Sequence, residues 1–399
     1  MRFGRKKNKA GSVIKLIAAV LGSLIAVAFV TFAVMFVLEA FFNIDTPLPP
    51  DGVVGDLANR FNVQLVVSPT PYITPEPTPT PYPMDDFIAE SEEKEIVFPA
   101  DFTYSWLGDP YCCDKKIVCS AGRLIDGSVR MFRLVEFNTE TGVMRELSVD
   151  AKNDHLLFPA FNDRWLVYFD ANYNIGGGNI CALDLTDRTA RPVVIKQVYI
   201  GQPEIKLYDN YISWIERTGS DRDKIFVCDL STQETTVIHY FDKSDYGTSI
   251  PSFGGGCLCW AAEDSSMPSL SSIRYISLDS STVYEYRPGT YVHDPEYNGK
   301  YFAWLDSNHA EGTNLYVSDT ASEPKLIASG VTEFGLSDSF IAYGVDNAVY
   351  MYVFDNGLTY RVSPERETTQ FLGVSGGAVM WMDVTSRERD IIKFAFPPV

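Results

Sequence analysis

Six carboxylates recur at matching points of this 399-residue chain, and their spacing is the feature that could most readily support chemistry. Each follows, by two or three residues, the anchoring residue that ends a short apolar strand signal. Carboxylates in such places either cap their own loops by accepting backbone N–H bonds or form a negatively charged ring that attracts a divalent cation or a basic partner. The six candidate binding residues are Asp170, Glu216, Glu263, Asp306, Asp346 and Asp383.

The elements that must position these carboxylates form a repeat. A two-residue polar turn, a short apolar strand and an anchor, usually aromatic, recur seven times, with anchors 49, 46, 46, 44, 39 and 38 residues apart. A four-stranded blade occupies about 40–50 residues, so this period predicts an all-β fold, a seven-bladed β-propeller. The seven anchors are Cys119, Tyr168, Trp214, Trp260, Trp304, Tyr343 and Trp381.

The two ends of the repeat region complement each other. The last repeat stops after a strand signal at residues 391–396 and lacks a fourth strand, while an unassigned strand signal lies upstream of the first repeat at residues 95–98. A ring can be closed by borrowing a strand from its other end, which also removes an exposed sheet edge. We therefore predict that residues 95–98 pair beside residues 391–396.

The N-terminal part of the chain predicts a membrane anchor. Residues 16–38 are 23 residues without a charge, long enough to cross a hydrocarbon core of about 30 Å. A cleaved signal peptide is the alternative, but its apolar region is usually only about 7–15 residues long. Basic residues precede the span and an acidic, proline-containing stretch follows it, so we expect a cytoplasmic N-terminus and an extracellular remainder at the cell membrane.

Four regions follow from these observations. Residues 1–15 form a short basic cytoplasmic tail, and residues 16–38 form the single transmembrane helix. Residues 39–94 form a juxtamembrane segment and a linker rich in Pro and Thr, in which seven of the fifteen residues from 69 to 83 are proline. Such a run favours an extended polyproline II spacer. Residues 95–399 form the propeller.

Charge and cysteine content narrow the possible partners. The chain has a net charge of −19, and because only one anion but six cations precede residue 43, the remainder carries −24. Nucleic-acid binding needs clustered Lys and Arg, so we expect no nucleic-acid partner. The seven cysteines are an odd number and imply no disulfide framework.

Residues 209–230, which read DNYISWIERTGSDRDKIFVCDL, resemble the blade repeat of TolB-like propellers. In that repeat a turn leads through an apolar strand and an Asp-rich loop into a second strand that ends in Asp-Leu. The resemblance extends over residues 95–399, although Asp-Asn, Gly-Gly or Gly-Lys replaces the family's Ser-Pro-Asp-Gly turn. It implies a propeller that binds peptides, proteins or sugars, and it implies no single activity.

Some TolB-like propellers are metal-dependent sugar lyases with histidine ligands, so the resemblance also draws attention to histidines. His155 and His293 both precede the first strand of a blade, and His309 lies in a loop. The first two fall in the second and fifth repeats, which are not neighbours in a ring. Nucleophile elbows, zinc-protease motifs and phosphate-binding loops are absent from the sequence.

The sequence therefore favours a membrane-anchored extracellular propeller that acts as a binding or scaffolding module and not as an enzyme. Its expected partners are an envelope protein or a cell-wall polymer, besides the membrane that residues 16–38 would cross. No cofactor is implied, unless the acidic ring holds a divalent cation. The alternative is a metal- or acid/base-dependent enzyme acting on polysaccharide, a lyase or a glycosidase, with its site at the mouth of the channel.

Overall fold

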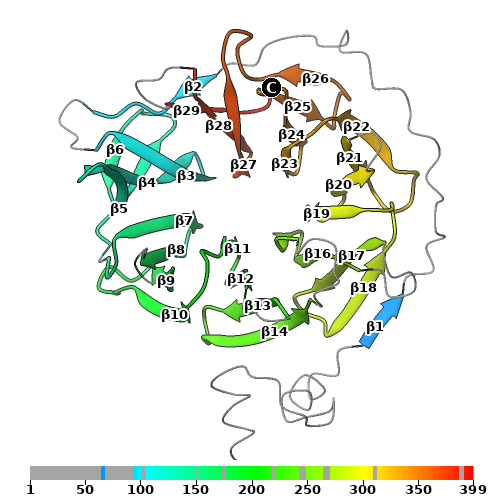
Figure 1. Ribbon diagram of the computed structural model, residues 1–399, viewed down its shortest axis with the longest axis horizontal. Coiled ribbons are helices and arrows are strands. Elements are labelled where there is room, and N and C mark those ends of the chain that lie inside the picture. The colour runs from blue at the N-terminus through cyan, green and yellow to red at the C-terminus, as the bar shows by residue number, and fades with distance from the viewer. Residues whose placement is uncertain are drawn as a thin grey trace, which may run out of the picture. The chain divides into compact units, whose positions relative to one another are not determined.

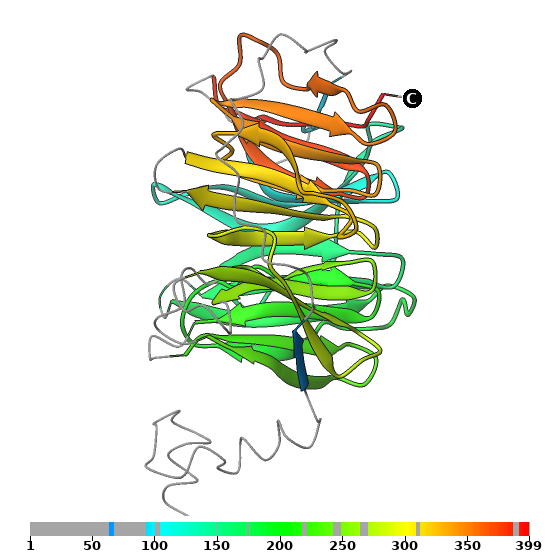
Figure 2. The same ribbon diagram turned by 90° about the vertical axis from the view of Figure 1, so that its right-hand side faces the viewer.

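The repeat builds a closed ring of seven β-sheets. In the computed structural model these sheets are the blades of an all-β propeller, arranged around a central axis (Figure 1). Figure 2 turns the ring on its side, and the turns that join the strands then lie along its two faces. The structure describes residues 64–67, 93–99, 104–149, 151–172, 174, 176–217, 222–241, 249–263, 270–308, 312–385 and 391–398.

Within each blade the chain runs outward from the axis, one antiparallel strand after another. The first three blades are β3 (Trp106–Cys113), β4 (Lys116–Ile125), β5 (Ser128–Asn138) and β6 (Met144–Glu146); β7 (His155–Phe161), β8 (Trp165–Asn172), β9 (Gly177–Asp184) and β10 (Val193–Val198); and β11 (Lys206–Tyr208), β12 (Tyr211–Glu216), β13 (Lys224–Asp229) and β14 (Glu234–Tyr240).

The next three blades follow the same order. They are β15 (Ser252–Gly254), β16 (Cys257–Glu263), β17 (Ser271–Ser277) and β18 (Thr282–Tyr286); β19 (Val292–Tyr297), β20 (Phe302–Asn308), β21 (Gly312–Ser318) and β22 (Lys325–Ser329); and β23 (Glu333–Leu336), β24 (Phe340–Val345), β25 (Ala348–Val353) and β26 (Thr359–Arg361). A further strand, β1 (Gln64–Val67), pairs in parallel with β18 in blade 4.

The seventh blade combines the two ends of the repeat region. It contains β27 (Thr369–Ser375), β28 (Ala378–Asp383), β29 (Ile391–Ala395) and, as its outer strand, β2 (Lys94–Glu95). Lys94 lies opposite Phe394 and Glu95 opposite Lys393 in an antiparallel register, and the Ile96 N–H donates to the carbonyl of Ile392 at 2.9 Å. Lys393 is 8% exposed, and its ammonium lies 3.4 Å from the Glu93 carboxylate. This pairing places the start of the propeller beside its end.

The polar turns and the anchors explain why each repeat folds as it does. In the first turn Asp114 and Lys115 have φ of 45° and 60°, and in the fourth Gly255 and Gly256 have 54° and 75°, the backbone of tight two-residue hairpins. Each anchor then lies on the second strand of its blade and is at most 4% exposed, with Trp304 at 0%. Burial of these anchors contributes to the apolar cores of the propeller.

The structure also bears on the cysteines and on the N-terminal part of the chain. All seven cysteines are unpaired, and five of them are buried. Among the described residues no helix has the length and apolar character needed to span a bilayer. The predicted tail and transmembrane helix, residues 1–38, and the proline-rich run at 69–83 lie outside the described residues.

Candidate functional site

A cavity of about 740 Å³ lies at the centre of the ring. Residues of the innermost strands, or of the segments that lead into them, line it from all seven blades. Because successive side chains of a strand point to opposite faces, every second residue of these strands can face the axis. In every blade the residue five positions before the polar turn that ends the innermost strand lines the cavity, and consecutive residues such as 204–208 line it as well.

Two positions of each innermost strand, here called the first and second levels, supply most of the charged side chains that line the cavity. The first level is the residue five positions before the first residue of each polar turn, and it is an acid in four of the seven blades. The second level is the residue three positions before that turn, and it includes Lys206 and Glu296. The first level consists of Asp109, Phe158, Glu204, Ile250, Asp294, Glu333 and Phe371, and the second level includes Tyr111, Lys206, Ser252, Glu296 and Gly373; all twelve line the cavity.

β-Bulges set the orientation of several of these side chains. Asp109, Phe158 and Asp294 have φ of 46°, 50° and 46°, each is followed by proline, and the pairing register of its strand shifts there. Proline lacks an N–H and cannot complete the ladder, and a bulge turns the preceding side chain out of the regular alternation. A bulky residue such as Phe158 rarely adopts positive φ, so the surrounding ring must stabilise this backbone.

The Asp109 carboxylate joins the first two blades. Its Oδ2 accepts a hydrogen bond from the Phe158 N–H at 3.1 Å and one from the Ser120 hydroxyl at 3.5 Å. Burial raises the pKa of Asp109, and the nearby Glu204 raises it further, while these hydrogen bonds oppose the shift. Asp109 thus supports the strained backbone at Phe158 and also adds an acid to the cavity wall.

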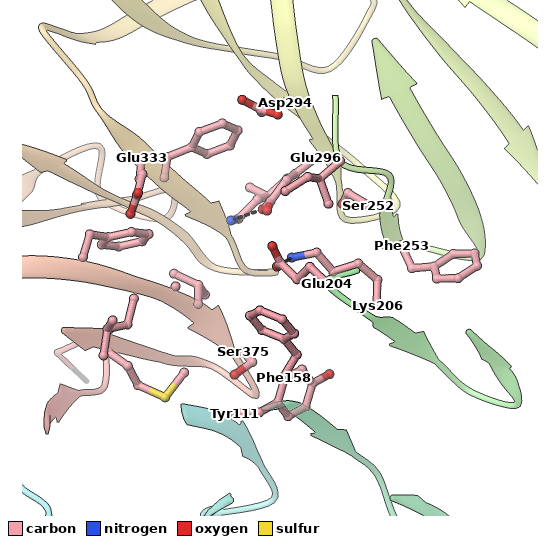
Figure 3. Close-up of a pocket in the computed structure, with 18 of the residues that line it drawn as sticks. Tyr111, Phe158, Glu204, Lys206, Ser252, Phe253, Asp294, Glu296, Glu333 and Ser375 are labelled. Carbon is pink, nitrogen blue, oxygen red and sulfur yellow. Dashed lines mark hydrogen bonds and ion pairs between the residues drawn. The ribbon is translucent and has the colours of Figure 1, made fainter. Parts of the chain in front are cut away.

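Lys206 of the third blade is influenced by two acids of the cavity. Its ammonium forms an ion pair with Glu204, and Glu296 is also close enough to act on it (Figure 3). Burial by itself would lower the pKa of Lys206, but the charges of Glu204 and Glu296 prevail and raise it. Lys206 is therefore a permanent cation at neutral pH, and Glu204 is its immediate partner.

Glu296 is the most perturbed acid of the cavity. Its Oε2 accepts a hydrogen bond from the Leu336 N–H at 2.5 Å, which joins blades 5 and 6. Burial raises the pKa of Glu296 to about 7; Lys206 and the Leu336 hydrogen bond oppose the rise, and Glu204 and Asp294 add to it. A carboxyl with this pKa changes its protonation state near neutrality.

The cavity holds more acid than base. Five carboxyl groups line it, from Asp109, Glu204, Asp294, Glu296 and Glu333, against the single ammonium of Lys206. Burial also raises the pKa of Glu333, and the charges of Glu204 and Asp294 add to the effect. These shifts are in the direction expected where like charges share a poorly solvated space. An incoming cation would relieve this repulsion.

Aromatic side chains also line the cavity. Tyr111 and Phe158 lie on the side of the cavity away from Asp294 and Glu333 in Figure 3. Burial raises the pKa of Tyr111 to about 12, so its phenol stays neutral. The same ring packs edge-on against Phe161 at 6.0 Å between centroids. Aromatic and acidic side chains thus share the wall of the cavity, since Asp109 accepts the Phe158 N–H and Phe334 follows Glu333.

The six carboxylates singled out by the sequence lie elsewhere. Asp170 accepts hydrogen bonds from the N–H groups of Lys152 and Asn153 at 2.9 and 3.0 Å, and Asp306 accepts from Thr290 and Tyr291 at 3.0 and 3.1 Å. Both lie on second strands and cap the segment that leads into their own blade. This is the loop-capping role, one of the two roles expected for these residues.

The other four have different surroundings. Asp383 accepts from the Thr385 N–H at 3.0 Å and lies 3.7 Å from the Lys393 ammonium, while Glu216 lies 3.7 Å from that of Lys196. Asp346 occupies a two-residue turn with φ of 49°, and the backbone carbonyl of Glu263 accepts from Arg274. None of the six lines the central cavity. Cation binding by these six residues stays a prediction.

Metal-ligating constellations are absent from the described ranges: no group of three or more His, Cys, Asp or Glu there could hold an ion. His155 accepts a hydrogen bond through Nδ1 from the Met131 N–H at 3.3 Å. His293 contacts Asp294 at 2.9 Å and Ser307 at 2.8 Å. His309 lies outside the described residues.

Sequence reasoning missed the cavity residues although a signal for them exists. Four prolines, Pro110, Pro159, Pro251 and Pro295, each stand nine residues before an anchor. A proline at a fixed place in an innermost strand marks a bulge, and the residue before it then faces the axis. The acids at the first level could have been aligned by the same offset.

Comparison with known proteins supports the fold. The β-propeller domain of the Trilobed protease from Pyrococcus furiosus matches with a TM-score of 0.57 at 14% identity, covering 73% of this chain and 93% of that one. An oligogalacturonate lyase from Vibrio parahaemolyticus matches with a TM-score of 0.52 at 13% identity, covering 77% and 94%. Identities this low show a shared propeller and no shared activity.

TolB from Acinetobacter baumannii also matches, with a TM-score of 0.44 at 12% identity over 59% of this chain and 60% of TolB. This similarity is too slight to carry an argument about the family. No protein-family model matches the sequence, and no curated protein matches it.

Proposed function

We propose that this protein is a single-pass membrane protein whose extracellular propeller binds an envelope protein or a cell-wall polymer, and that the central cavity receives a cationic group of that partner. The observation that carries the proposal is the excess of five carboxyl groups over one ammonium in a cavity of about 740 Å³. Neither a metal nor an organic cofactor is needed for this role.

The acidic and aromatic side chains that line the cavity suit an alkylammonium or guanidinium group. Glu333 has no cationic partner among the described residues, and Asp294 is bonded only to the neighbouring His293 among ionisable groups. A ligand cation can pair with these acids while its aliphatic stem lies against Phe158 and Tyr111. Entry of the cation also lowers the pKa of Glu296, which burial has raised to about 7, so binding releases a proton near pH 7.

A titration with defined probes tests this proposal. The full chain in nanodiscs of neutral lipid is titrated with tetralysine, which stands for a basic protein segment, and with a glucosamine tetramer, which stands for an amino-sugar polymer. The N-acetylated form of each probe is the uncharged control. We expect one charged probe to bind and its acetylated form to bind at least tenfold more weakly, and the probe that binds identifies the source of the cation.

Matched variants localise the binding. The double variant Asp294→Asn/Glu333→Gln removes two cavity charges with little change of shape, whereas Glu323→Gln removes one charge from an exposed loop outside the cavity. The proposal predicts at least tenfold weaker binding for the first and unchanged binding for the second. Binding that is insensitive to the cavity variant, or absent for both charged probes, overturns it.

One observation favours an enzyme acting on polysaccharide as a second candidate. Glu296, whose pKa is raised to about 7 by burial, lies near the ammonium of Lys206 and could act as a general acid or base. Release of reducing ends or unsaturated products from uronic-acid or amino-sugar polymers, lost in Glu296→Gln and kept in Glu323→Gln, would establish this function. Absence of turnover on these polymers would exclude it for them.

A further inference from the structure

The outer edge of blade 2 carries a group of exposed large hydrophobic side chains. Among the described residues eight large hydrophobic side chains are strongly exposed, and five of them belong to this one edge. Single exposed hydrophobic residues are normal on a soluble surface, but a group of them marks an interaction site. The five, with their exposed fractions, are Leu185 (41%), Val193 (40%), Val194 (41%), Tyr199 (68%) and Ile200 (53%).

The loop that follows β10 holds two of these side chains outward. The Gly201 N–H donates to the carbonyl of Gly176 at 2.8 Å. At Gly177 the neighbouring backbone approaches so closely that a Cβ would lie 2.2 Å from the Val198 carbonyl oxygen. Tyr199 and Ile200 are therefore presented by a backbone packed against the β8–β9 hairpin, and their exposure is built into the blade.

The backbone of β10 is available for pairing. It pairs with β9 on one side, and within the described ranges no strand pairs with its other side. Most of the other outer strands limit such pairing, as edges of natural sheets usually do: β6 and β26 have three residues each, and β14 begins with the polar residues Glu234 and Thr235. In blade 4 the edge of β18 is covered by β1. Of these strands, β10 combines six residues with exposed valines; its register with β9 shifts between Val194 and Lys196, so the regular edge for a partner begins at Val193 and Val194.

The charge near this edge differs from that of the propeller as a whole. Residues 184–200 contain three cations and two anions, in a chain whose net charge is −19. Arg188 and Arg191 are exposed just before β10, whereas Lys196 within it lies 3.7 Å from the carboxylate of Glu216. An apolar segment with acidic flanks would match this edge in both hydrophobicity and charge.

We propose that the outer edge of blade 2 is a docking site for an extended segment of a partner protein, which adds to β10 as a fifth strand. Main-chain hydrogen bonds to β10 supply affinity, and apolar side chains against Val193, Val194, Tyr199 and Ile200 supply specificity, with acidic residues near Arg188. The pairing of β1 with β18 shows the same kind of addition at another blade of this ring. The site is independent of the central cavity.

Hydrogen exchange on the full chain in nanodiscs of neutral lipid tests this inference. The probe is an acetylated octapeptide in which valine and threonine alternate between terminal glutamates, and the same peptide with terminal lysines is its charge control. We expect the acidic peptide to slow exchange of the β10 amides at least tenfold at saturation, and the lysine peptide to have a much smaller effect.

Two variants of similar chemistry assign the effect to the edge. Val194→Glu places an anion on β10, where it repels the acidic peptide, while Val143→Glu changes a valine on blade 1 that is 60% exposed, against 41% for Val194. The peptide should bind at least tenfold more weakly to the first and unchanged to the second, with the melting temperature showing that both variants fold.

Other occupants give different results and would overturn the inference. Protection of β10 that depends on protein concentration without peptide assigns the edge to a second copy of this chain. Protection that appears only when the nanodisc contains anionic lipid assigns it to the membrane surface. No protection under any of these conditions leaves β10 an exposed edge without a partner.

Discussion

The second strand and the innermost strand of each blade are neighbours in one sheet, but they follow different rules. The second strands are almost uniformly buried and apolar, as β8 and β28 show, and each carries an anchor at the same offset from its turn. The innermost strands carry bulges in β3, β7, β19 and β27, and their cavity-facing positions range from Phe158 to Glu333. The repeated part builds the scaffold, and the part that departs from the repeat carries the candidate site.

The largest expected effect lies on the scaffold side. Trp304→Ala removes a side chain that is 0% exposed and stacks near Tyr316, and we expect it to cost about 3–5 kcal/mol of unfolding free energy. Trp304→Phe should cost clearly less, because it keeps an aromatic ring and removes an indole N–H that is buried without a hydrogen-bond partner among the described residues. Urea denaturation followed by circular dichroism measures both. Equal costs for the two variants would show that the shape of the indole matters more than its burial.

A smaller effect is expected in the cavity and depends on pH. Because burial raises the folded-state pKa of Glu296 from 4.5 to about 7, the folded protein retains its proton more tightly than the unfolded chain does. The resulting stability is fully present below about pH 4.5 and is lost as the pH rises through about 7. Glu296→Gln, which keeps an acceptor for the Leu336 N–H, should flatten the dependence of unfolding free energy on pH between these values.

The matched control for this measurement is Glu323→Gln, a change on the exposed surface. It should leave the pH profile of stability as it is in the unmodified protein. A Glu296→Gln profile that keeps the same slope between pH 4.5 and 7 would mean that Glu296 titrates normally and that another group causes the slope.

The smallest effect concerns divalent cations. Asp170 and Asp306 already accept two backbone N–H bonds each, so we expect the melting temperature of the EDTA-treated protein to stay unchanged when calcium, manganese or zinc is added. Binding at 100 times Kd would add about 2.7 kcal/mol of stability, which a thermal melt resolves easily. A shift that Asp170→Asn or Asp306→Asn abolishes would instead make these carboxylates metal ligands.

Much of the fold could be predicted from the sequence because its determinants are local. A tight turn and the anchor five residues after its first residue lie in one hairpin, so their relation survives in every blade. The seven-fold period then required a ring with buried anchors, which the structure confirms. The transmembrane helix and the linker predicted within residues 1–94 stay predictions, as does their placement at the membrane.

The candidate site could be predicted less well. The six rim carboxylates stand two or three residues after their anchors, but this offset alone did not tell that five of them lie on second strands, one strand away from the axis, and that Asp346 lies in the turn after such a strand. The residues of the cavity stood at equal offsets too, five before each turn. Their types vary from blade to blade, so a search for repeated chemistry passed over them.

By itself the sequence determined the number of blades, the turns, the anchors and the strongly acidic character of the chain, because each depends on residues near one another or on composition. Only the tertiary structure decided that Asp109, Glu204, Asp294, Glu296 and Glu333 share one cavity with Lys206. Their proximity arises from the closure of the ring, which brings distant strands around one axis. The pKa of Glu296 follows from that closure, since burial and neighbouring charges exist only once the blades are assembled.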